Sequence, residues 1–176
     1  SPSQNRSTAA PQIRYSARVL PTCGGLSTQI LHLNNRNVAV GYSAYPASGS
    51  HAAMWTSKGV IRDLGTLGGD TSIAWSINDV GDVAGTAWTG TRQQHAFRWS
   101  ATGGMRDLGT LGGSTSVALS INEVGQIAGG ATDSEENEHA VVWSVDGKIH
   151  DLGFLPNGTA AGEARGINSR GTVAGW

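Results

Sequence analysis

Residues 107–143, DLGTLGGSTSVALSINEVGQIAGGATDSEENEHAVVW, contain every landmark that recurs along this chain. DLGTLGG begins at Asp63 and again at Asp107, and DLGFLPNG begins at Asp151, so this landmark returns every 44 residues. A divergent copy, VLPTCGG, begins at Val19 at the same spacing. A fixed period of this length indicates a repeat architecture in which each repeat is one supersecondary unit.

Two further landmarks keep the same register. His-Ala-x-x-Trp begins at His51, His95 and His139, and a third element reads LNNRNVAVG, INDVGDVAG, INEVGQIAG and INSRGTVAG in successive copies. The copies predict a single repeat domain over residues 1–176. Its expected parts are an N-terminal arm at residues 1–12 and repeats at about 19–62, 63–106, 107–150 and 151–176.

Each repeat is expected to form four short strands. In the copy that contains the quoted stretch, the first strand is expected over residues 103–111, beginning just before that stretch. The second is STSVALSIN, in which apolar and small residues alternate. Gly125 then ends a tight turn, and QIAGGA and HAVVWS are the third and fourth strands. Four antiparallel strands per repeat of this length predict an all-β fold, a β-propeller with about four blades. A β-solenoid or β-prism-like array is the alternative.

The register at the start of the chain predicts how a propeller would close. STAAP, residues 7–11, precedes HAAMW by 44 residues, and the last repeat stops at a third strand. Each blade would then combine strands four, one, two and three, and the N-terminal segment would pair with the last blade. The alternatives are a fragment of a longer array and a half-ring that closes by dimerising.

Composition excludes several classes of protein. A net charge of −1 with 14% charged residues argues against a dedicated nucleic-acid binder. No apolar run is long enough to predict a membrane span. The GTLGG runs precede strands and lack a following Lys-Ser/Thr, so they are turn glycines rather than phosphate loops. No cofactor is predicted.

These motifs resemble the HAF-repeat family, a group of bacterial repeats named for a His-Ala-Phe element. The element is literal here only at His95–Phe97, while the frame DLGTLGG…S.A..IN..G.(V/I)AG matches from about Val19 to Gly175. The resemblance implies a secreted, extracellular, propeller-like repeat protein. It implies no biochemistry, because a fold does not by itself specify a function.

One histidine, one tryptophan and one aspartate recur in each repeat. Residues related by rotation from blade to blade do not converge on one point, so we expect a structural network instead of a metal or catalytic site. In such a network the imidazole is hydrogen-bonded to Asp, Ser or Thr, and the indole packs beside it. Its predicted members are His51, Trp55, Asp63, His95, Trp99, Asp107, His139, Trp143 and Asp151.

Ligand binding is expected where the repeats differ. The loop between the third and fourth strands keeps its length while its content changes, as YSAYPASGSH, TAWTGTRQQH and GATDSEENEH show. Aromatic rings stack on sugar faces, and amides, Arg and carboxylates bind hydroxyls. The predicted binding residues are Tyr42, Tyr45, Trp88, Arg92, Gln93, Gln94, Asp133, Glu135 and Asn137.

The predicted function is a non-catalytic module that binds a carbohydrate or cell-surface polymer through these rim loops. The alternative is a structural module that assembles into a homo-oligomer or filament. An enzyme acting on polysaccharide ranks third, because Glu163 and Asp133 are its only candidate acid–base groups. Trp75 is expected in the core, and Glu163 and Arg165 are expected to line a rim or channel, because they break the repeat pattern.

Overall fold

The structure is a computed structural model that describes residues 17–46, 49–153 and 162–176. The described residues form strands and turns, in sheets of four, eight and two strands. The eight-stranded sheet consists of two groups of four that meet through a single parallel pair, Gln94 with Thr115. The all-β prediction is therefore confirmed for the described part of the chain.

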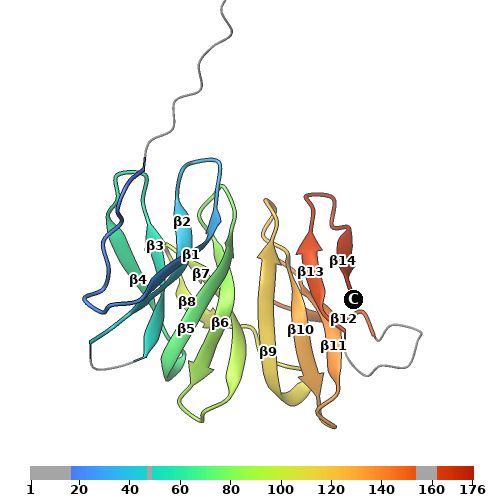
Figure 1. Cartoon of the computed structure of the whole chain (residues 1–176). Coiled ribbons are helices and arrows are strands. Elements are labelled where there is room, and N and C mark those ends of the chain that lie inside the picture. The colour runs from blue at the N-terminus through green and yellow to red at the C-terminus, as the bar shows by residue number, and fades with distance from the viewer. Residues whose placement is uncertain (1–16, 47–48, 154–161) are drawn as a thin grey trace, which may run out of the picture.

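The strands fall into four consecutive groups, which Figure 1 shows side by side, with the first and last groups at opposite ends. The first group is β1 (Thr28–Leu33), β2 (Ala39–Ala44), β3 (Ser50–Trp55) and β4 (Ile61–Gly65). The second is β5 (Gly68–Ile77), β6 (Val83–Thr89), β7 (Gln94–Ser100) and β8 (Gly104–Asp107). The third is β9 (Gly112–Ile121), β10 (Ile127–Asp133), β11 (Glu138–Trp143) and β12 (Ile149–Asp151), and the fourth is β13 (Ala164–Ile167) and β14 (Val173–Gly175).

The predicted assembly of strands four, one, two and three is wrong. Each complete group contains the second, third and fourth strands of one repeat, followed by the first strand of the next. Short turns hold these strands in one antiparallel sheet, whereas the Gly-rich runs after Asp63 and Asp107 carry the chain to the neighbouring group. In the second of these runs Gly109 and Gly112 have φ of 72° and 111°, which favours glycine. The expected closing segment, residues 7–11, lies outside the described residues.

A ladder of asparagine side chains joins the four groups. The amide nitrogens of Asn34, Asn78 and Asn122 each donate to the backbone carbonyl of the equivalent asparagine in the next group, at 2.9, 3.1 and 2.9 Å. The last acceptor is Asn168. Each side-chain oxygen also accepts the backbone N–H four residues later, closing its own β-turn. One residue type thus shapes the turn and fixes its distance from the next turn.

The core lies between neighbouring groups. Trp143 is fully buried, and its indole nitrogen donates to the carbonyl of Leu108 at 3.0 Å, at the entry to the third group. The Val, Leu and Ile faces of the strands pack around it with alanines from the preceding group. Removing such a buried tryptophan costs about 3–5 kcal/mol.

Replacing Asn78 with alanine should lower the free energy of unfolding by about 2–4 kcal/mol. Asn78 is 1% exposed, and its loss leaves the carbonyl of Asn122 and the N–H of Asp82 without this partner. Urea denaturation measures the change. Asn35→Ala is the control, because Asn35 is exposed and bonds only Asp79, so it should cost under about 1 kcal/mol. Equal losses in both variants would contradict a special role for the ladder.

Candidate functional site

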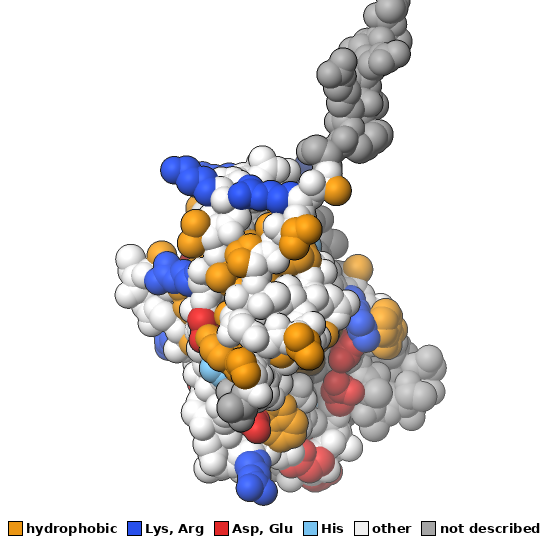
Figure 2. Space-filling view, turned by 60° about the vertical axis from the view of Figure 1, so that its left-hand side comes forward, with side chains coloured by type: hydrophobic (Ala, Val, Ile, Leu, Met, Phe, Trp, Pro, Cys, Tyr) orange, Lys and Arg blue, Asp and Glu red, His pale blue; other side chains and the backbone are white. Residues whose placement is uncertain are grey.

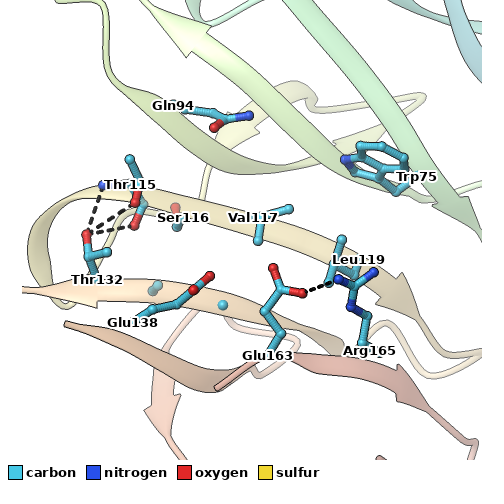
Figure 3. A pocket seen from close by; sticks show the side chains of 12 residues that line it. Trp75, Gln94, Thr115, Ser116, Val117, Leu119, Thr132, Glu138, Glu163 and Arg165 are labelled. Atoms are coloured by element: carbon cyan, nitrogen blue, oxygen red, sulfur yellow. Dashed lines mark hydrogen bonds and ion pairs between the residues drawn. The ribbon is translucent and has the colours of Figure 1, made fainter. Parts of the chain in front are cut away.

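A cavity of about 410 Å³ opens between β5, β9 and β13. These three strands and β1 begin the four groups and are called the inner strands here. Figure 3 shows Trp75 and Gln94 on one wall and the carboxylates of Glu138 and Glu163 on the opposite wall, with Val117 and Leu119 of β9 between them. The cavity therefore combines an aromatic ring, an amide and two acidic groups on four different strands or their ends.

Every inner strand carries a β-bulge at the same place. In β5 the pairing with β6 passes over Trp75, because Ala74 lies opposite Gly85 and Ser76 lies opposite Ala84. A bulge inserts an unpaired residue and redirects its side chain. The residues at this position are Leu31, Trp75, Leu119 and Arg165, and the last three line the cavity.

Trp75 is half-buried, so the expectation that it packs in the core is corrected. Its indole nitrogen donates to the hydroxyl of Thr86 at 3.1 Å, which fixes the ring against β6. In β9 the alternating residues Thr115, Val117 and Leu119 all line the cavity, and Trp75 holds in β5 the place that Leu119 holds in β9, so its ring faces the same space. A ring held in this way provides a rigid flat surface for a ligand.

The charges in the cavity are unequal in number. Arg165 forms an ion pair with Glu163 at 2.7 Å and also lies 4.0 Å from the ring centroid of Trp176. Glu138 faces the same space. Burial raises the pKa of Glu138, and the charge of Glu163 raises it further, against an opposing effect of Arg165. The cavity thus carries an excess of negative charge and of hydrogen-bond acceptors.

The repeated His and Asp residues pair within each group. His51, His95 and His139 each bring Nδ1 within 3.0, 2.8 and 2.9 Å of the aspartate twelve residues later. These partners are Asp63, Asp107 and Asp151. Each pair joins the third strand of its group to the fourth strand beside it.

Serine and tryptophan extend this network between groups. Ser116 accepts the N–H of Ala96 at 2.9 Å and donates to the carbonyl of Gly109 at 2.7 Å, and Ser72 repeats both bonds in the preceding group. The indoles of Trp55 and Trp143 donate to the carbonyls of Pro21 and Leu108. Trp99 is buried in the core between the first two groups, beneath Arg62.

His139 differs from the other two histidines because its Nε2 lies 3.1 Å from Asp133. Burial alone would lower the pKa of His139, but the hydrogen bonds and charges of Asp151 and Asp133 raise it overall. Asn137 and the backbone N–H groups of its loop lower the pKa of Asp133 to about 2. Asp133 is thus an ionised partner of its own loop, which makes it a poor general acid.

Several rim-loop residues use their polar groups in hydrogen bonds within the protein, either inside the loop or to a neighbouring strand. Asp133 accepts the N–H groups of Glu135 and Asn137. Tyr42 donates to Gln29, and Tyr45 donates to Asp63. Gln94 is the member of the predicted set that lines the 410 Å³ cavity.

Trp88 and Arg92 line a second cavity, of about 360 Å³, beside Gly68 and Gly69. Trp88 is 39% exposed, and Arg92 has a φ of 63° in the turn that ends at Gln93. Gln93 donates its N–H to the hydroxyl of Thr89, so the turn is held from within. This second cavity is a distinct place to test the rim-loop prediction.

Charge on the face that the first group presents is mixed. Figure 2 shows basic side chains spread from the top to the bottom of this face and acidic side chains in its lower half. Such a face lacks the single-sign stripe that a polyanion requires. Among the described residues no group of three or more His, Cys, Asp and Glu is placed to hold a metal ion. In the same residues no helix is long and apolar enough to cross a membrane.

Sequence variation pointed to part of the cavity. Trp75 and Arg165 stood out because they occupy one slot that differs between repeats, and Glu163 stood out in the lengthened last repeat. The sequence does not predict Glu138 as a cavity residue, because it directly precedes the repeated His139 in the variable loop, whereas the structure places it at the start of β11. Its equivalent in the preceding repeat is Gln94, and that difference was the available signal.

Glu138→Gln should raise the free energy of unfolding at pH 7 and leave it unchanged at about pH 4. Because the pKa of Glu138 is raised in the folded protein, the stability it contributes is present at low pH and is lost as the pH rises through that pKa. Urea denaturation at the two pH values measures the difference. The exposed Glu135→Gln is the control and should change neither value. A gain for Glu138→Gln that is equal at both pH values would contradict the electrostatic explanation.

No protein-family model matches the chain, and no curated protein matches it. The resemblance to the HAF repeats therefore rests on the motifs quoted above, and the site is interpreted from its own geometry.

Proposed function

We propose that this chain is a non-catalytic, propeller-like module that binds a carbohydrate in the cavity between β5, β9 and β13. The observation that carries the proposal is a cavity whose wall includes the residue at the bulged position of each of β5, β9 and β13, a position where the repeats differ in side chain. The repeats supply the frame, and this position supplies Trp75, Leu119 and Arg165.

The chemistry of the cavity suits a sugar. Trp75 offers a flat apolar surface, and Gln94, Thr115, Glu138 and Glu163 offer hydrogen-bonding groups around it. Carbohydrate recognition needs this combination, because a pyranose ring has apolar C–H faces and a rim of hydroxyl groups. The excess of carboxylates favours neutral sugars and amino sugars over uronic acids.

A propeller-like ring with about four blades is the part of the proposal that concerns architecture. The antiparallel groups follow one another, the inner strands β5, β9 and β13 line one cavity, and the asparagine ladder repeats from one group to the next. Both features support successive blades about an axis. Secretion is proposed from the resemblance to the HAF repeats, and an extracellular module of this kind would meet glycans or cell-surface polymers.

Trp75→Ala should weaken oligosaccharide binding at least tenfold, on the order of 1.4 kcal/mol, because the stacking surface is lost. Isothermal titration with cellohexaose, a glucosamine hexamer and a galacturonate hexamer measures affinity and class. Trp75→Phe should retain part of the affinity. Unfolding curves of each variant separate a binding loss from a folding loss.

Trp88→Ala is the matched control and should bind within about twofold of the unmodified chain, since Trp88 lines the second cavity. Loss of binding in Trp88→Ala with none in Trp75→Ala would move recognition to the rim loops. Mass spectrometry of the oligosaccharides after incubation should recover them intact. Cleavage products that disappear in Glu163→Gln would favour an enzyme over a binding module.

A further inference from the structure

The buried seat of Trp143 has a counterpart one repeat later. Trp143 packs in a cluster that includes Ala96, Leu108, Ala118 and Ile127, and its indole bonds the carbonyl of Leu108. The residues at the same repeat positions one copy further on line a cavity of about 370 Å³, and they are Ala140, Leu152, Ala164 and Val173. The same apolar seat is therefore built twice.

Exposure shows that the second seat is not covered by the described chain. Leu108 is 9% exposed beneath Trp143, whereas its counterpart Leu152 is 51% exposed. Trp176 borders the cavity but is itself 58% exposed and lies against Arg165, so it does not fill the seat. The apolar surface around Leu152 thus lacks the indole that the repeat pattern places there.

The backbone beside this seat is also open. Strands β6 and β10 each pair on both sides, while β14 pairs with β13 alone among the strands that the structure describes. Gly175 stands where Gly129 stands in β10, and a Cβ on Gly129 would lie 3.0 Å from the ring of Trp143. Glycine at this position leaves room for a ring. The close approach of the neighbouring inner strand also requires glycine there.

We propose that the groove between Leu152 and β14 binds an extended partner segment with the pattern His-Ala-x-x-Trp. The segment would add to β14 as an antiparallel strand, with its tryptophan opposite Val173, as Trp143 lies opposite Ile127. Its indole would enter the apolar seat and donate to the carbonyl of Leu152. Strand addition of this kind takes affinity from the backbone and specificity from a side-chain pocket.

Two features indicate the partner: the shape of the groove, and the pairing of the described strands that carry the same pattern. The described strands of this pattern, β3, β7 and β11, pair on both sides within their groups. These described strands are therefore not free to occupy the groove, and the proposed occupant is a partner segment that carries the same pattern. This inference does not depend on carbohydrate binding, because Trp75 and Gln94 do not line the groove.

The test uses a dye-labelled peptide with the sequence NEHAVVWSVDGKIH, which copies residues 137–150. Titration with the full chain, followed by fluorescence anisotropy, should give saturable binding, and analytical ultracentrifugation should give a complex of one chain and one peptide. The same peptide with Trp143→Ala should bind at least tenfold more weakly. Hydrogen exchange should slow at Val173–Gly175 when the unmodified peptide is bound.

Leu152→Gln in the protein should weaken peptide binding at least fivefold. Val145→Gln is the matched control, because Val145 is 52% exposed and lies in the turn between β11 and β12. It should bind like the unmodified chain. Absence of saturable binding, equal binding of the two peptides, or equal effects of Leu152→Gln and Val145→Gln would each overturn the proposal.

Discussion

The hydrogen bond from the side chain of one asparagine to the backbone of the next is the constraint on which the arrangement of the groups depends. Asn78 accepts within its own turn and donates to Asn122, so turn shape and group spacing cannot change independently. Because each turn leads directly from an inner strand, the ladder also fixes how closely neighbouring inner strands approach. A buried, fully satisfied polar network of this kind specifies one arrangement better than apolar contact alone.

The bulge on the inner strands is the second constraint. It provides a position where the side chain can vary without a change in the strand pairing. One face of β5 and β9, with Ala74 and Ala118, is committed to the core, and the other face of β9 lines the cavity. The bulged residue has no partner in the register of the neighbouring strand, so Leu31, Trp75 and Arg165 can differ without disturbing the pairing around them. Chemical variety is therefore tolerated at the point where the pairing of each inner strand is interrupted.

Much of the fold could be predicted from the sequence, because turn glycines, asparagines and alternating apolar residues act locally. The NEVG turn and the strands around Val117 and Val141 are found where the patterns placed them. The assignment of strands to sheets failed, because a repeat boundary in sequence does not show which Gly-rich connection crosses between sheets. The cavity was predicted only in part, since a bulge at Trp75 arises from its pairing with β6 and leaves no local signal.

Glu163 lines both the 410 Å³ cavity and the groove beside β14, so the two proposed sites share a wall. Its backbone exchanges hydrogen bonds with Trp176, and its carboxylate pairs with Arg165 across the start of β13. A strand that orders β14 would therefore also order the carboxylate that faces Trp75. If both sites are occupied in the working protein, thermodynamic linkage requires that each ligand change the affinity of the other by the same factor. The short sheet of β13 and β14 then couples assembly to recognition, because both sites touch it.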